Sequence, residues 1–183
     1  MTPPYVYVIL TAGWVLWVTP FLLMRRKRTQ AQRIDKRARW GIVIQAVGYT
    51  LLLQGRFWER SPQAWQVAVS VLLFAIAALI SWNASRALGR QWRFDAGLNA
   101  DHELVMAGPY RFVRHPIYAS MFSVLLGTGF LMTPWWLFIP AIILFVIGTE
   151  IRVRIEDKLL AAHFGDKHAE YRRRVSAYIP FLR

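Results

Sequence analysis

Four long stretches without a charged side chain constrain this chain of 183 residues more than any other feature. They cover residues 1–24, 40–55, 61–85 and 116–149. A helix rises about 1.5 Å per residue, so about 20 apolar residues cross a hydrocarbon core of about 30 Å. Residues 5–24 and 64–82 reach this length, whereas residues 40–53 form a shorter segment that contains Gln45. Soluble domains seldom hold so many uncharged runs, and the pattern predicts an integral membrane protein.

The last uncharged run, residues 116–149, is too long for one span, because a helix of this length would extend about 51 Å. Pro134 lies near its middle and disfavours helical backbone at Thr133. We therefore expect a tight helical hairpin with helices over residues 117–132 and 135–149. The tryptophans that open the second helix would then lie at the far membrane interface, where such rings are enriched.

The distribution of basic residues favours five spans over four. With five spans, 21 of the 23 Lys and Arg residues lie on one side, in residues 25–39, residues 86–114 and the tail from Arg152. The positive-inside rule makes this side cytoplasmic and puts the N-terminus outside. Residues 1–24 have no basic residue before the apolar run, so we expect a span there instead of a cleaved signal peptide.

The predicted fold class is therefore all-α, a polytopic membrane protein with about five transmembrane helices and a cytoplasmic C-terminal helix. No repeat or long linker divides the chain, which predicts a single domain over residues 1–183. Its N-terminal spans would occupy residues 5–56, and a catalytic and cofactor-binding region would cover about residues 86–183. The expected location is the inner membrane of a bacterium or the endoplasmic reticulum of a eukaryote.

Composition and spacing exclude other classes. The net charge of +13 suits a nucleic-acid binder, but the basic residues flank the apolar runs instead of forming one soluble face. The sequence has no cysteine, which excludes disulfides and thiolate nucleophiles. Its four histidines show no paired His-x-x-x-His spacing, so we expect no metal site.

Polar residues of unusual types collect in two segments on the predicted cytoplasmic side, residues 101–118 and 152–165. In the first segment, Pro116 suits the first turn of a helix, with Arg114 and His115 directly before it. A helix N-terminus beside an arginine favours anions. Two nearby tyrosines add flat surfaces for an aromatic ring, Tyr110 and Tyr118. The alternative is that these side chains only anchor the helix among lipid headgroups.

The second segment continues the last apolar helix into the cytoplasm. Arg152 and Glu156 are four residues apart on one helical face, as are Glu150 and Arg154. Ordinary exposed pairs of this kind contribute only about 0.3–0.5 kcal/mol. The alternative is that the adjacent acids Glu156 and Asp157 point into a pocket, where carboxylates can hold ribose hydroxyls or an ammonium group.

An ordered set of short motifs runs through the C-terminal 100 residues or so. It consists of His102-x-Leu104-Val105, Gly108-Pro109-Tyr110, Arg114-His115-Pro116-x-Tyr118, Arg152-x-x-x-Glu156, Phe164-Gly165, Tyr171 and Ile179-Pro180. This set resembles the isoprenylcysteine carboxyl methyltransferase family and its relatives among phospholipid methyltransferases. Two positions depart from the pattern. Asp157 replaces a second glutamate, and His168 stands where a tyrosine is expected.

The resemblance implies a small membrane enzyme that holds S-adenosylmethionine near the cytoplasmic face. The residues that would line the cofactor pocket are His102, Leu104, Val105, Tyr110, Arg114, His115, Pro116, Ile117, Tyr118 and Glu156. Arg152 resembles the family arginine that faces the substrate carboxylate. The candidate catalytic residues are therefore Arg152 and Glu156, and no metal is implied.

The implied reaction moves a methyl group to a lipidic or amphipathic substrate, most simply the carboxylate of an isoprenylcysteine-like acid. A carboxylate needs no general base, whereas a lipid amine would need one, with Glu156 or His163 as candidates. A phospholipid or a small hydrophobic amine or thiol is the alternative acceptor. The alternative class is a non-enzymatic membrane protein that binds anionic lipid or a partner through residues 25–28 and 172–174. A nicotinamide-dependent reductase of related topology is a third class. In each case we expect membrane lipid as a partner, and no nucleic acid.

Overall fold

The structure is a computed structural model that describes residues 2–24, 31–58, 61–91, 97–99 and 103–178. Its helices are α1 (Pro4–Met24), α2 (Ala38–Gln54), α3 (Ala64–Leu88), α4 (Pro116–Met132), α5 (Trp135–Phe164) and α6 (Asp166–Arg174). Three short 3-10 turns accompany them, η1 (Gly55–Phe57), η2 (Gly89–Gln91) and η3 (Gly108–Arg111). Strands β1 (Ala31–Ile34) and β2 (Gly97–Asn99) form one antiparallel pair that the sequence pattern did not predict.

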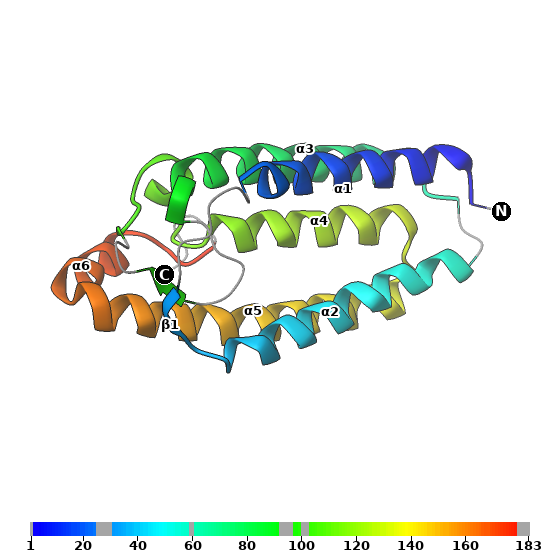
Figure 1. The fold of residues 1–183 in the computed structure, drawn as a ribbon. Coiled ribbons are helices and arrows are strands. Elements are labelled where there is room, and N and C mark those ends of the chain that lie inside the picture. The colour runs from blue at the N-terminus through cyan, green and yellow to red at the C-terminus, as the bar shows by residue number, and fades with distance from the viewer. Residues whose placement is uncertain (1, 25–30, 59–60, 92–96, 100–102, 179–183) are drawn as a thin grey trace.

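The five longest helices run side by side along one axis (Figure 1). The ends of α3 and α5 and the beginnings of α2 and α4 meet at the same end of this bundle, together with α6 and the short strands. We call it the polar end, because the charged residues of α5 and α6 lie there. The pairing of the helices is specific, since α3 packs along α1 and α4, and α2 packs along α5.

The apolar helices identify an integral membrane protein. Among the described residues, three helices are long and apolar enough to cross a membrane: Pro4–Leu23 within α1, Ala64–Leu88 and Trp135–Phe164. Helix α4 is a shorter apolar helix of 17 residues, and α2 also has 17 residues. Large apolar side chains on these helices point outward, among them Leu79 (65% exposed) and Ile143 (53% exposed), as expected for a surface in contact with lipid.

The helix break in the last apolar run is confirmed at Thr133 and Pro134, which both have extended backbone between α4 and α5. The two helices that flank the break are in contact, with the rings of Phe130 and Phe138 5.3 Å apart, but they are not each other's main partners, because α4 lies mainly along α3 and α5 mainly along α2. The physical reason is that α2 inserts its side chains at this place. Leu52 of α2 is fully buried in one apolar cluster with Leu125 of α4 and Phe145 of α5.

Helices α2 and α5 approach each other closely at two glycines. A Cβ atom on Gly148 would lie 2.6 Å from the carbonyl oxygen of Gly41, and a Cβ atom on Gly41 would lie 2.5 Å from that of Gly148. Small residues allow helices in membranes to pack at such short distances. The contact brings the buried Gln45 to α5, where its Nε2 donates a hydrogen bond of 2.7 Å to Thr149 Oγ1.

Candidate functional site

The beginning of α4 lies against the C-terminal segment of the chain at the polar end. Pro116 is the first residue of α4, as predicted. The backbone N–H groups of Arg114 and His115 donate to the carbonyls of Ser176 and Ala177, both at 2.8 Å. These two N–H groups are therefore engaged within the chain, and they fix the start of α4.

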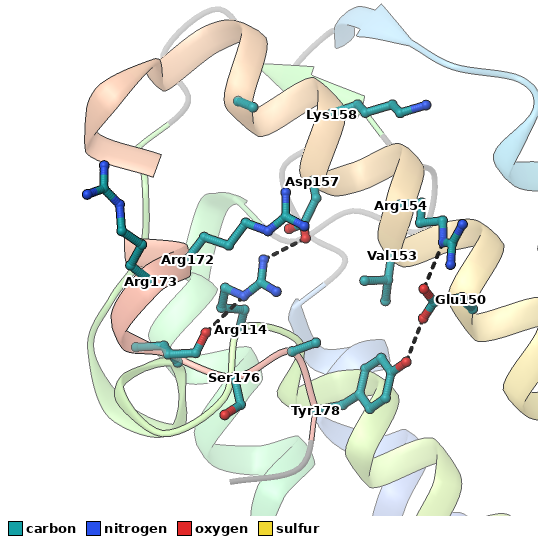
Figure 2. Close-up of a pocket in the computed structure, with 13 residues that line it drawn as sticks. Arg114, Glu150, Val153, Arg154, Asp157, Lys158, Arg172, Arg173, Ser176 and Tyr178 are labelled. Atoms are coloured by element: carbon teal, nitrogen blue, oxygen red, sulfur yellow. Dashed lines mark hydrogen bonds and ion pairs between the residues drawn. The ribbon is translucent and has the colours of Figure 1, made fainter. Parts of the chain in front are cut away.

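Asp157 of α5 is the centre of the charged cluster behind this backbone contact. Its Oδ2 accepts a hydrogen bond of 2.5 Å from Arg114 Nη1 (Figure 2), and its Oδ1 lies 3.3 Å from His115 Nε2. His168 of α6 approaches the same carboxylate, with Nε2 at 3.5 Å from Oδ1. The two positions that depart from the family pattern, Asp157 and His168, are thus neighbours, and nothing in their sequence spacing indicated this contact.

Glu156 is the more accessible of the two adjacent acids. Its side chain is 23% exposed, compared with 10% for Asp157. The hydroxyl of Tyr118 donates a short hydrogen bond to Glu156 Oε1, and His115 Nδ1 lies 3.5 Å from Oε2. An ionised carboxylate offers about four acceptor positions, so Glu156 can accept further hydrogen bonds from a ligand.

Arg152 is buried on the face of α5 that looks toward α2 and α4. Its Nη2 lies 3.9 Å from Glu156 Oε1, which confirms the predicted pair on one helical face. Its guanidinium stands over the ring of Tyr118, 5.0 Å from the centroid. Its Nη1 donates to Gln45 Oε1 at 3.4 Å. Gln45 was missed as a site residue, although an amide in an apolar helix is a recognised indication of function.

The two histidines that face Asp157 have opposite pKa shifts. Burial lowers the pKa of His115, but the hydrogen bonds and negative charges of Asp157 and Glu156 outweigh burial, and the pKa is raised above 6.5. Burial dominates at His168 and lowers its pKa, although Asp157 opposes the shift. At pH 6.5 we therefore expect a proton on both nitrogens of His115 and a neutral ring at His168.

The other predicted residues are distributed around this cluster. Tyr110 is buried in η3, where its carbonyl accepts a hydrogen bond of 2.5 Å from the Tyr171 hydroxyl. Leu104 and Val105 are half-buried in the segment before η3, and Ile117 is half-buried in the first turn of α4. His102 and the Ile179-Pro180 motif lie outside the described residues. His163, the alternative base, is on an exposed face near the end of α5.

A cleft of about 840 Å³ borders the cluster on the side of the Arg114–Asp157 pair (Figure 2). It lies between the charged half of α5, the last turn of α6 and the C-terminal segment. Among the site residues predicted from the sequence and described by the structure, Arg114 alone lines this cleft. The cleft is therefore distinct from the contacts of Arg152 and Glu156.

A bundle of apolar helices with a buried, charge-paired cluster at one end defines an integral membrane protein with a polar site next to its apolar segments. Comparison with known proteins gives the family. Residues 65–167 match the family model described as phospholipid methyltransferase. The chain belongs to this family, which confirms the resemblance carried by the C-terminal motifs. The matched region contains α3, α4 and α5 but neither α1 nor α2.

Relatives with different functional names are similar to this chain. The protein-S-isoprenylcysteine O-methyltransferase of Saccharomyces cerevisiae is 36% identical over 84 residues, which are 45% of this chain and 35% of the relative. The cobalt-zinc-cadmium resistance protein CzcN of Cupriavidus metallidurans is 30% identical over 78% of this chain and 62% of the relative. The methanethiol S-methyltransferase of Crocosphaera subtropica is 32% identical over 40% of this chain and 28% of the relative. The chain thus covers less than two thirds of the length of each.

Proposed function

We propose that this protein is an integral membrane methyltransferase that moves a methyl group from S-adenosylmethionine to a lipidic or amphipathic substrate. The observation that carries the proposal is the charge-paired cluster where the apolar part of α5 ends, in which His115, Tyr118 and Arg152 are buried and Glu156 is partly exposed. Membership in the phospholipid methyltransferase family and similarity to methyltransferases of two substrate types support it.

The residues present fit S-adenosylmethionine by their chemistry. Glu156 keeps acceptor capacity for ribose hydroxyls, because it is partly exposed and receives a hydrogen bond from Tyr118. His115 lies between the two acids, with Nδ1 3.5 Å from Glu156 Oε2 and Nε2 3.3 Å from Asp157 Oδ1, and so orients Glu156 for these contacts. We further propose that Leu104, Val105, Tyr110, Arg114, Pro116 and Ile117 contribute to cofactor binding, and the same role for His102 rests on its motif alone.

When bound, the cofactor supplies an electrophilic methyl group on a sulfonium centre. Displacement at this carbon is in line, so the protein chiefly has to hold donor and nucleophile in position, which can contribute about 7–11 kcal/mol. Arg152 would orient an anionic nucleophile, since a guanidinium binds a carboxylate with two parallel hydrogen bonds. Two of its contacts, to Gln45 Oε1 and Glu156 Oε1, measure 3.4 and 3.9 Å.

A carboxylate of an isoprenylcysteine-like acid is the acceptor that we propose first, because Arg152 matches it in charge and geometry. A thiol is the alternative acceptor, favoured by the similarity to a methanethiol S-methyltransferase. We further propose five spans, with the N-terminus outside and the polar end in the cytoplasm. The five longest helices traverse the bundle in alternating directions, as this topology requires (Figure 1).

A binding titration of S-adenosylhomocysteine against the purified protein in detergent tests the cofactor site. We expect saturable binding to the parent protein and at least about tenfold weaker binding to Glu156→Ala and His115→Ala, since each loses a charged hydrogen-bonding group worth about 1.5–3 kcal/mol. Arg111→Ala is the control, because Arg111 is exposed near the same end of the molecule and stacks only on Phe112. An absence of binding to the parent protein would refute the proposal.

Arg152→Ala separates cofactor binding from substrate orientation. We expect it to bind S-adenosylhomocysteine within about threefold of the parent and to turn over an S-prenylated cysteine at least about tenfold more slowly, because the acceptor loses its bidentate partner. Radiolabelled methyl transfer measures the rate, and a prenyl thiol without a carboxylate is the matched substrate. An equal loss with both substrates would exclude a role of Arg152 in carboxylate recognition.

A further inference from the structure

The cleft beside the cluster has a strongly basic lining, and apart from Arg114 the proposed methyl transfer does not use these basic residues. Five basic and two acidic side chains line it. The first residue of α5 that lines the cleft is Glu150, which directly follows the uncharged run that ends at Thr149. The cleft therefore borders the place on α5 where the uncharged run ends and the charged half of the helix begins.

Both acidic side chains of the cleft are already paired with arginines that also line it. Asp157 accepts the 2.5 Å hydrogen bond of Arg114, and both side chains are at most 10% exposed. Glu150 accepts a hydrogen bond of 2.8 Å from Arg154 and another of 2.6 Å from the Tyr178 hydroxyl (Figure 2). These pairs account for two of the five cations.

The remaining three cations come from two helices. Lys158 stands on α5, and Arg172 and Arg173 stand in the last turn of α6. All three are exposed, and within the ranges that the structure describes their side chains make no ion pair. The cleft therefore carries three uncompensated positive charges around a cavity large enough for a small ligand.

We propose that this cleft is a binding site for a phosphate group. A phosphate monoester carries about −1.5 to −2 charges at pH 7, which matches the excess of cations. The side chain of Arg172 reaches toward Asp157, and that of Arg173 points the other way (Figure 2). A guanidinium group matches phosphate in geometry, because it presents a planar fork of donors to a pair of oxygens. A lipid headgroup and a soluble phosphate-bearing molecule offer the same group. The proposal is independent of the methyl-donor site.

A titration with inorganic phosphate tests the site in the full chain. The protein is held in a maltoside detergent, which contains no phosphate, and calorimetry follows binding at constant ionic strength. We expect saturable binding to the parent and at least about tenfold weaker binding to the double variant Arg172→Gln/Arg173→Gln, because the variant loses two positive charges and their hydrogen bonds to the phosphate oxygens. The parent's failure to bind phosphate would overturn the proposal.

The matched control removes two arginines of α2 and the turn before it, Arg37→Gln/Arg39→Gln. Both are exposed at the polar end but lie outside the cleft. This control should bind phosphate within about twofold of the parent, whereas general electrostatic attraction would weaken both variants equally and contradict a specific site. Unchanged binding of S-adenosylhomocysteine by Arg172→Gln/Arg173→Gln shows that the variant is folded.

Mixed micelles with phosphatidic acid or with neutral diacylglycerol identify the source of the phosphate. If a headgroup occupies the cleft, phosphatidic acid competes with inorganic phosphate in the parent, and diacylglycerol does not. If neither lipid competes, the cleft takes a soluble phosphate-bearing molecule. If phosphatidic acid competes equally well with phosphate in Arg172→Gln/Arg173→Gln, the lipid binds outside the cleft, and this result would contradict the assignment of a headgroup to the cleft.

Discussion

Replacing Asp157 with asparagine should lower the melting temperature of the protein in detergent by about 6–20 °C. The change keeps the shape of the side chain and removes its charge. Arg114 is then left as a charged group that is 9% exposed and has lost its carboxylate partner. Breaking a buried ion pair from one side costs about 3–5 kcal/mol, and a chain of this length loses about 2–4 °C per kcal/mol.

Glu170→Gln is the control for this measurement. It also removes the acid of an ion pair, with Arg174, but both side chains are at least 60% exposed. Exposed pairs contribute about 0–1 kcal/mol, so the melting temperature should change by no more than about 4 °C. Equal losses in the two variants would show that Asp157 does not hold the polar end together.

A double variant identifies which partner of Asp157 causes the loss of stability. If the unpaired guanidinium causes the loss, Arg114→Gln/Asp157→Asn should melt at a higher temperature than Asp157→Asn alone, because the buried charge is gone. If His115 or His168 is the critical partner instead, the second substitution should restore nothing. Thermal unfolding followed by circular dichroism distinguishes the two results.

Gly148→Ala should destabilise the protein by about 2 kcal/mol, although alanine is the better helix former. Helix propensity alone predicts a gain of about 0.5–1 kcal/mol. The new Cβ atom, however, would lie 2.6 Å from the backbone oxygen of Gly41 and 2.8 Å from Gln45 Cγ. No rotation of a side chain relieves the first of these contacts, so α2 and α5 must separate. Such overpacking costs about 1–3 kcal/mol.

Gly127→Ala provides a matched substitution in α4. The nearest atom to its Cβ would be Ser70 O at 3.3 Å, a contact that a shift of a few tenths of an ångström relieves. We expect the stability of this variant to stay within about 1 kcal/mol of the parent. The melting temperatures of the two variants test this difference. A Gly148→Ala protein as stable as the parent would rule out the close approach of α2 and α5 at Gly148.

The positions of the helices could be predicted from the sequence because their ends depend on local features. Charged residues border the apolar runs. Pro116 begins α4, and Pro134 separates α4 from α5, because the proline ring restricts the backbone. The choice of partner for each helix could not be predicted in this way. That choice depends on which side chains fill the space between α4 and α5, and Leu52 comes from a segment about 80 residues away.

The candidate site was predictable where residue type and spacing carry information. His115, Tyr118, Arg152 and Glu156 are brought together as their motifs predicted. The C-terminal segment that fastens Arg114 and His115 was not predictable, because its hydrogen bonds use backbone atoms that any residue provides. The contact between Asp157 and His168 depends on the turn at Gly165, whose φ of +52° sends α6 back toward α5.

Because α2 packs against α5, the region that matches the family model, residues 65–167, cannot be transferred to another protein on its own. The matched region begins at residue 65, yet the amide that touches Arg152 and the glycine that lets α5 come near both belong to α2. A chimera that joined residues 65–183 to unrelated N-terminal helices would keep the motifs but lose the contacts of α2 with Arg152 and Gly148. Its designer would have to supply a small residue opposite Gly148 and a polar side chain one turn further along, in the places that Gly41 and Gln45 occupy here.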